Sequence, residues 1–135
     1  MYDANLELKD AGLVASDAAG TVDSQPQIID LGEGLVKGTM VVDVSAIEIA
    51  SNDEKYKISL QGCNENDFNS GYEDLVILEL GAKEVIGGDI DSEPGRYEIP
   101  FINRRNGTIY RYIREYCDVA GAIATGINFS AYINK

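Results

Sequence analysis

The chain has 135 residues with neither histidine nor tryptophan, and its 23 acidic and 11 basic residues give a formal net charge of −12. A chain of this length forms one domain that buries roughly two-thirds of its unfolded surface without metal or disulfide staples. A body this acidic repels phosphate backbones, so we expect no nucleic-acid partner. No apolar stretch approaches the roughly 20 residues needed to cross a bilayer, and the N-terminus lacks a secretion-signal pattern, so we expect no membrane partner.

The charge is unevenly distributed along the chain. Residues 1–98 contain 21 acidic and 6 basic residues, a net charge of −15, whereas residues 99–135 contain 2 and 5, a net charge of +3. One interpretation is a solvated acidic surface that keeps the protein in solution. The sharper interpretation is that Arg104, Arg105, Arg111 and Arg114 face acidic groups on a partner or on a second copy of the chain.

Residues 1–25 are expected to form an N-terminal arm outside the core. Ala, Asp, Gly and Ser are abundant there, with one short apolar patch at 6–8 and another at 13–14. We expect this arm to pack on its own domain or on a neighbour. Residues 26–135 then form a single domain.

Beyond the arm the dominant period is two, which is typical of half-buried strands. Residues 55–61 and 127–133 carry apolar side chains at every second position, and so do residues 39–44, where Met40, Val42 and Val44 alternate with Thr39, Val41 and Asp43. Residues 75–80 form a nearly continuous apolar run, which predicts a central strand covered on both sides. Three more strands are predicted, at residues 26–31, 96–102 and 109–119.

The connections between these strands are rich in Gly, Asn and Asp, and no segment keeps a helical period for three turns. Many short strands joined by such turns indicate a sandwich or a barrel. The sequence therefore predicts an all-β protein, an antiparallel β-sandwich with the jelly-roll arrangement of about eight strands. We expect less than about 10% helix.

Residues 95–119 read as strand, turn and strand. Asn106 and Gly107 both tolerate positive φ, as a tight hairpin turn requires. In the second strand Ile109, Ile113, Cys117 and Val119 share a face with Arg111 and Glu115. We expect that face to point inward, with Arg111 and Glu115 paired near its rim, because an unpaired buried charge is costly.

The opposite face of that strand would then carry the tyrosines outward. Tyrosine and arginine give a large contact area with hydrogen-bonding tips, and no nucleophile or base stands among them. The sequence therefore predicts a protein-contact surface and not a reaction centre. Its residues are Arg104, Arg105, Tyr110, Arg111, Tyr112, Arg114 and Tyr116.

The sequence offers little for catalysis or for metal binding. General acid–base chemistry usually recruits histidine, which is absent, and the carboxylates at 73–74 and 89–93 are expected to be exposed in loops. Residues 64–71 have the composition of a calcium loop, but Phe68 occupies the third ligand position and Leu75 the twelfth. Cys63 and Cys117 lack metal-site spacing and are expected to be buried free thiols. We expect no enzymatic activity, no cofactor and no metal.

Several short segments occur in a distinctive order. They are Ile-Ile-Asp-Leu-Gly at 28–32, Ile-Ser-Leu-Gln-Gly at 58–62 followed by Asp-Phe at 67–68, Arg-Tyr at 96–97 leading to Phe101, and Tyr-Arg-Tyr-Ile-Arg at 110–114. Together they resemble the cement or decoration proteins of short-tailed bacteriophage capsids, over roughly residues 26–133. The chain departs from that pattern at Glu115, where an apolar residue is more usual, and in the two arginines before Asn106.

This resemblance implies a jelly-roll domain on the outer surface of a virion, made in the host cytoplasm, that stabilises contacts between major capsid protein subunits. It implies two partners, the major capsid protein and the chain itself. We expect a two-fold homodimer, with a trimer as the alternative. A carbohydrate-binding or host-adhesion module on a virion or cell surface is the competing class, because jelly rolls also serve as lectins.

Overall fold

The computed structural model describes residues 6–135, and nearly all of its regular structure is β, with 57% strand and 4% helix. The prediction of an all-β protein with little helix is confirmed. Seven strands have eight residues or more: β1 (Glu7–Val14), β6 (Lys37–Ile47), β7 (Lys55–Cys63), β8 (Glu73–Gly81), β9 (Gly95–Ile102), β12 (Tyr112–Ala120) and β13 (Ile127–Asn134). The short elements are β2 (Ala18–Ala19), β3 (Thr21–Val22), β4 (Gln25–Pro26), β5 (Ile29–Asp30), β10 (Arg104–Arg105), β11 (Thr108–Ile109) and the helix α1 (Lys83–Ile86).

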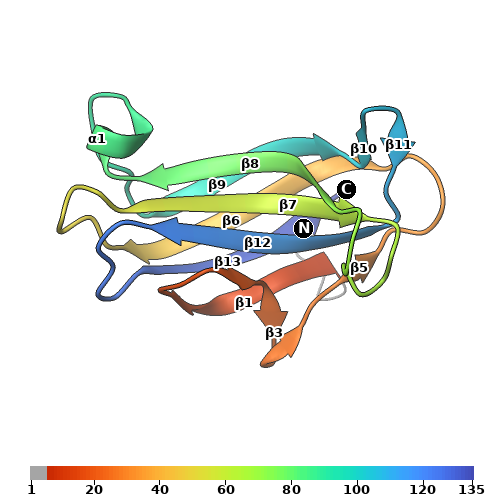
Figure 1. The fold of residues 1–135 in the computed structure, drawn as a ribbon, viewed down its shortest axis with the longest axis horizontal. Helices are drawn as coiled ribbons and strands as arrows, with labels where there is room; N and C mark the ends of the chain where they lie inside the picture. Colours follow the sequence, from red (N-terminus) through yellow and green to blue (C-terminus); the bar gives the residue numbers. More distant parts are fainter. Residues whose placement is uncertain (1–5) are drawn as a thin grey trace.

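The long strands form two antiparallel sheets that face each other (Figure 1). One sheet has the order β1-β13-β6-β9, and the other has the order β2-β12-β7-β8 with β5 also paired to β12. If β2 and β5 are taken as one interrupted strand, the first strand pairs with the last, the second with the seventh, the third with the sixth and the fourth with the fifth. This nested pairing is that of a long hairpin rolled into two sheets, the eight-stranded jelly roll that the sequence predicts.

The core lies between the two sheets and follows the period-two pattern. Strand β7 points Tyr56, Ile58 and Leu60 inward, and all three are fully buried. Strand β13 does the same from the other sheet with Ile127, Phe129, Ala131 and Ile133. Each large apolar side chain buried in this way contributes about 1.5–3 kcal/mol to folding, so these two alternating segments are major sources of stability.

The expectation of an arm outside the core is wrong for residues 7–14. These residues form β1, which pairs with β13 over its whole length, and Leu8 is fully buried in the core. The register shifts on either side of Lys9, which breaks the period-two pattern and hides the strand from sequence reasoning. Residues 1–5 of the expected arm lie outside the described residues.

Two further expectations need correction. Strand β8 is at the edge of its sheet and is not central, and Ile77 in its middle is 46% exposed. Strands β9 and β12 do not pair with each other, because β9 pairs with β6 in one sheet and β12 pairs with β7 in the other. The turn at Asn106 belongs to the separate small hairpin β10–β11, which connects the two sheets.

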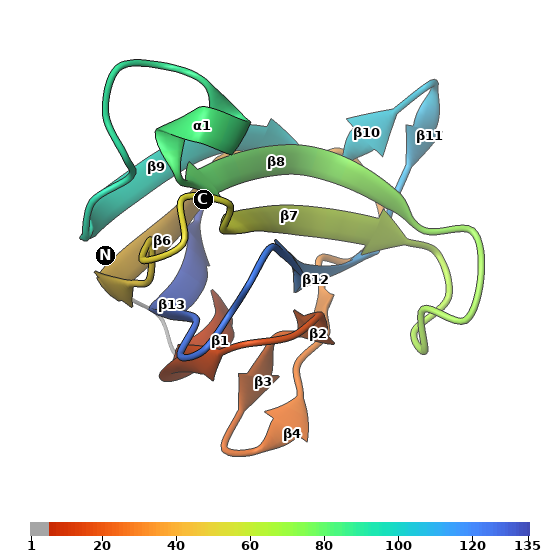
Figure 2. The ribbon, with the colours of Figure 1, turned by 60° about the vertical axis from the view of Figure 1, so that its left-hand side comes forward.

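The connections gather at the two ends of the sandwich. Figure 1 shows the β10–β11 hairpin at one end, beside the loops of residues 31–36 and 64–72, and α1 at the other end with the β6–β7 and β12–β13 turns. A second small hairpin, β3–β4, interrupts the strand made of β2 and β5 and extends away from the sandwich (Figure 2). We call the end that carries β10 and β11 the hairpin end.

Candidate binding surface

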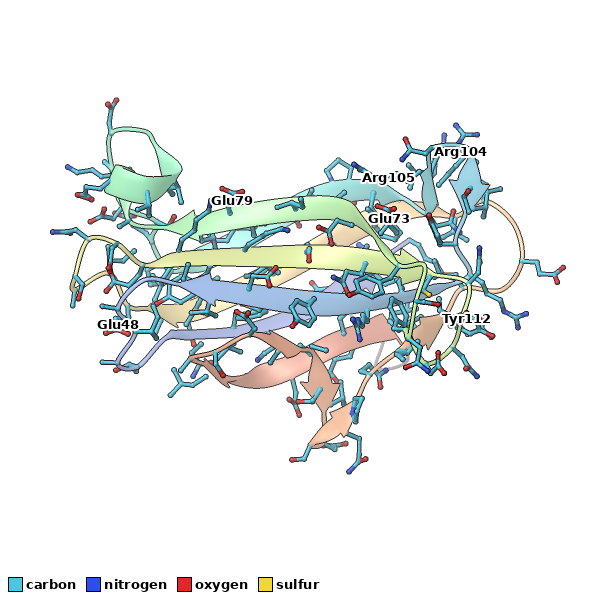
Figure 3. The ribbon with its side chains drawn as sticks, in the orientation of Figure 1. Glu48, Glu73, Glu79, Arg104, Arg105 and Tyr112 are labelled. Carbon is cyan, nitrogen blue, oxygen red and sulfur yellow. The ribbon has the colours of Figure 1, made fainter. Side chains whose placement is uncertain are left out.

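The seven predicted contact residues fall into two groups. Five of them lie at the hairpin end or at the start of β12 next to it: Arg104, Arg105, Tyr110, Arg111 and Tyr112. Figure 3 labels Arg104, Arg105 and Tyr112 at that end. The other two, Arg114 and Tyr116, lie on the outer face of β12, since Ile113, Glu115 and Cys117 occupy the inner face.

The β10–β11 hairpin presents Arg104 and Arg105 to solvent. Arg105 pairs with Thr108 across the hairpin, and Asn106 and Gly107 at the tip have φ values of 52° and 80°. Two adjacent positive φ values are what a tight two-residue turn of this kind requires, so the predicted turn is confirmed. Both arginine side chains are exposed, and neither forms an ion pair with any residue in the range 6–135.

A buried asparagine fixes the base of this hairpin. Asn103 is fully buried, and its side-chain Oδ1 accepts a hydrogen bond from the Val36 amide at 2.7 Å. Its Nδ2 donates to the carbonyls of Gly34 and Tyr110 at 3.0 and 2.9 Å. The side chain thus joins three segments of backbone, which makes the hairpin a fixed projection and not a loose loop. An asparagine close to a turn looks like another turn residue, so sequence reasoning missed it.

Tyr110 is not part of an outward surface, contrary to the prediction. It is only 8% exposed, because the chain crosses there from the hairpin to the sheet and the strand alternation begins two residues later. The Tyr110 side chain packs closely on Gly62. A Cβ added at that glycine would lie 2.9 Å from the Tyr110 Cβ and 3.1 Å from its Cγ. Tyr112 and Tyr116 are partly exposed, as predicted.

Arg111 is engaged within the protein by a partner that differs from the predicted Glu115. Its Nε and Nη2 donate to the two carboxylate oxygens of Asp30 at 2.8 and 2.9 Å. This hydrogen bonding, with a further hydrogen bond from the Gly32 amide, lowers the pKa of Asp30 to about 2, and it raises the pKa of Arg111 in turn. The guanidinium also lies 5.4 Å from the ring centroid of Tyr112. Arg111 therefore anchors β5 to the start of β12.

Arg114 has a different environment on the outer face of β12. Its Nε donates to Oε1 of Gln61 on the neighbouring strand β7 at 2.8 Å. Its guanidinium carbon lies 4.6 Å from the ring centroid of Phe68 and 5.4 Å from those of Tyr72 and Tyr116. Phe68 and Tyr72 come from the loop between β7 and β8, which folds over the sheet to reach Arg114. We call Arg114, Gln61, Phe68, Tyr72 and Tyr116 the Arg114 cluster.

Glu115, the next residue, points into the core and is 1% exposed. Neither of its carboxylate oxygens has a hydrogen-bond partner among the described residues. Burial raises its pKa to about 8, although Lys9 and Arg114 nearby oppose that shift. Lys9 lies in β1, within the segment expected to be an arm, so its approach to Glu115 could not be predicted from the sequence.

Other chemistry is sparse in the part of the chain that the structure describes. Residues 6–135 contain no group of three or more His, Cys, Asp or Glu side chains able to hold a metal ion. Within the same residues no helix is long and apolar enough to span a bilayer. Cys63 and Cys117 are buried free thiols, as predicted, and burial raises the pKa of Cys117. The carboxylate of Asp74 pairs with Lys57 at 3.1 Å.

Neither the comparison with protein-family models nor the comparison with curated proteins finds a match to this chain.

Proposed function

We propose that this protein is a structural component of a virion that binds the outer surface of an assembled phage capsid and stabilises contacts between major capsid protein subunits. The observation that carries the proposal is the fixed, basic hairpin at one end of an otherwise acidic jelly roll. Arg104 and Arg105 project there and pair with no acidic residue in the described part of the chain, residues 6–135, although the whole chain has 23 acidic residues. The order of sequence segments that resembles cement proteins supports the same proposal.

A cement protein needs rigid contact points and no catalytic machinery. Exposed arginines at a rim mainly set the rate and the orientation of encounter, and each contributes about 0.2–1 kcal/mol when solvated. If each copy bridges several shell subunits, such modest contacts multiply through effective concentration. A two-fold pair of copies would double the number of contact points per attached unit, and we propose this state over a trimer.

The test is co-sedimentation with capsid shells that lack the protein, taken from the phage that encodes it. We expect the parent chain to bind the shells, and the variant with Arg104→Ser and Arg105→Ser to bind them about tenfold more weakly. Rising salt should weaken shell binding by the parent more than shell binding by the variant. The free energy of unfolding, measured by thermal melting, should change by less than about 0.5 kcal/mol, because both side chains are exposed.

Lys83→Ser provides a control, because Lys83 is an exposed cation in α1 at the opposite end of the sandwich. Its shell binding should equal that of the parent. Parent protein that stays in the supernatant at every salt concentration would contradict the proposed function. Retention of the parent on a glycan surface instead would favour the carbohydrate-binding alternative.

A further inference from the structure

The Arg114 cluster holds a guanidinium group in a fixed place on the outer face of the β2-β12-β7-β8 sheet. Three aromatic rings lie within 5.4 Å of it, and the Gln61 hydrogen bond fixes its Nε edge. Arginine is weakly hydrated and stacks favourably on aromatic faces, so such an environment immobilises the side chain at little desolvation cost. An immobilised donor loses less entropy when it binds a ligand.

The loop that supplies two of the rings is itself well fixed. Phe68 is 4% exposed and is held in a left-handed backbone conformation with φ of 54°. The Cys63 thiol at the end of β7 accepts a hydrogen bond from the Glu65 amide and donates to the carbonyl of Ser70. The side chain of Asp67 accepts hydrogen bonds from both the backbone and the side chain of Asn69.

Arg114 differs from Arg96 and Arg111, whose partners are carboxylates. Arg96 pairs with Asp43 and Arg111 pairs with Asp30, each through two hydrogen bonds to one carboxylate. No carboxylate among the described residues lies within 4.0 Å of Arg114, and its terminal amino groups make no hydrogen bond to those residues. Acidic residues outnumber basic ones by 23 to 11, so a shortage of carboxylates is not the reason.

The surroundings of Arg114 have the features of a protein-contact site. Tyr72 and Ile77 are each 46% exposed, and Ile77 lies in the same cross-strand row as Tyr116, with buried Ser59 between them. Aromatic and arginine side chains next to an apolar rim are enriched among the residues that dominate binding energy. Two acids of the same sheet, Asp74 and Asp118, already have a cation beside them, because both lie close to Lys57, at 3.1 and 3.8 Å.

We infer that Arg114 is the anchor of a second contact with the capsid shell. There its terminal amino groups bind the carboxylate of an Asp or Glu side chain of the capsid protein. This inference rests on the proposed function and adds a site that lies away from the hairpin. A guanidinium binds a carboxylate through two parallel hydrogen bonds, which gives the contact a defined direction as well as strength. The surrounding rings exclude water from that pair and strengthen it.

The experiment compares shell binding of Arg114→Gln with that of Arg96→Gln, a matched loss of one arginine on the other sheet. Arg114→Gln should bind shells at least about tenfold more weakly than the parent, whereas Arg96→Gln should bind as the parent does. Arg114→Lys keeps the charge but not the planar pair of donors, and it should recover only part of the loss. The salt dependence of shell binding should be smaller for Arg114→Gln than for the parent.

Phe68→Leu is the control for a purely structural role of Arg114, because it loosens the loop but keeps the arginine. The salt dependence of shell binding by Phe68→Leu should equal that of the parent, even if its affinity for the shell falls. An Arg114→Gln variant with the parent's affinity, or with a reduced affinity but an unchanged salt dependence, would overturn the inference and leave the proposed function intact. Displacement of bound parent protein by N-acetylneuraminic acid but not by hexaglutamate would overturn the assignment to a protein carboxylate. A parent chain that fails to bind shells would overturn both.

Discussion

Arg114 and Glu115 are neighbours in β12, yet the pleat of the strand places them in opposite environments. On the outer face, Arg114 finds a hydrogen bond and three rings, and it still has donors to offer to a partner. On the inner face, the carboxylate of Glu115 has no hydrogen-bond partner among residues 6–135. The comparison shows that the phase of a strand, and not the charge of a residue, decides whether a charged side chain can serve binding or instead opposes folding.

The charge of Lys9 in β1 acts on the Glu115 carboxyl, but Lys9 donates its hydrogen bonds to backbone carbonyls instead. Lys9 donates to the carbonyls of Asp10, Gly12 and Phe129 at 2.9, 3.1 and 2.7 Å, which uses all three of its donors. It also lies 4.5 Å from the ring centroid of Phe129. Burial lowers the pKa of Lys9, and the neighbouring carboxyl of Glu115 opposes this effect. Lys9 therefore ties β1 to β13 but gives Glu115 no hydrogen bond.

The largest effect is expected for Lys9→Met. The substitution removes the donor for the buried carbonyl of Phe129 and for two further carbonyls, which should cost about 3 kcal/mol in the free energy of unfolding. Urea unfolding followed by far-ultraviolet circular dichroism measures it. A variant within about 0.5 kcal/mol of the parent would show that these hydrogen bonds do not hold β1 in place.

Glu115→Gln should have a smaller effect that depends on pH. The pKa of Glu115 is about 8 in the folded protein against an ordinary 4.5, so the folded state holds more protons than the unfolded state between these values. The contribution of this group is therefore present below about pH 4.5 and is lost as pH rises through about 8. The free energy of unfolding of the variant, measured by thermal melting, should match that of the parent near pH 5. Near pH 9 it should exceed that of the parent by about 1–3 kcal/mol.

This prediction takes account of the charged groups around Glu115. Lys9 on β1 and Arg114 on β12 favour its ionised form, while Asp118 disfavours it, and the Cys117 thiol next to it has a raised pKa. If the parent and Glu115→Gln have parallel melting profiles from pH 5 to pH 9, Glu115 does not carry the pH dependence. The contrast between the two faces of β12 would then be one of geometry alone.

The smallest effect is expected from Arg111→Gln, next to the start of β12. The pKa of Asp30 is lowered to about 2 from an ordinary 3.8, so its contribution to stability is present above about pH 3.8 and is lost as pH falls through about 2. Acid unfolding of the parent should therefore include a component that the variant lacks. Nuclear magnetic resonance titration of the Asp30 carboxyl in both proteins measures this directly, and equal midpoints would contradict the assignment.

Much of the fold was predictable because its main strands follow a simple pattern. Residues 55–61 and 127–133 alternate without interruption, and both form strands with their apolar residues in the core. The tip of the β10–β11 hairpin was equally accessible, since Asn106 and Gly107 tolerate the positive φ that such a turn requires. Strand β1 was missed because the register shifts around Lys9 interrupt the alternation.

The candidate surface was predicted only in part. Arg104, Arg105, Tyr112, Arg114 and Tyr116 are at least partly exposed. Tyr110 is buried, because its position depends on where the chain crosses between the sheets. The Arg114 cluster could not be foreseen either, since Phe68 and Tyr72 reach it from a loop more than forty residues away in the sequence.

The sequence by itself determined the fold class, the hairpin turn and the concentration of arginine near the C-terminus, because local backbone preferences and period-two burial act over a few residues. Only the tertiary structure decided the partners of the charged side chains. Arg111 pairs with Asp30, 81 positions away, and the carboxyl of Glu115 interacts electrostatically with Lys9 of the other sheet. Such pairings depend on which strands the rolled hairpin brings together and on which face each residue occupies, and neither is encoded in the spacing of residues along one strand.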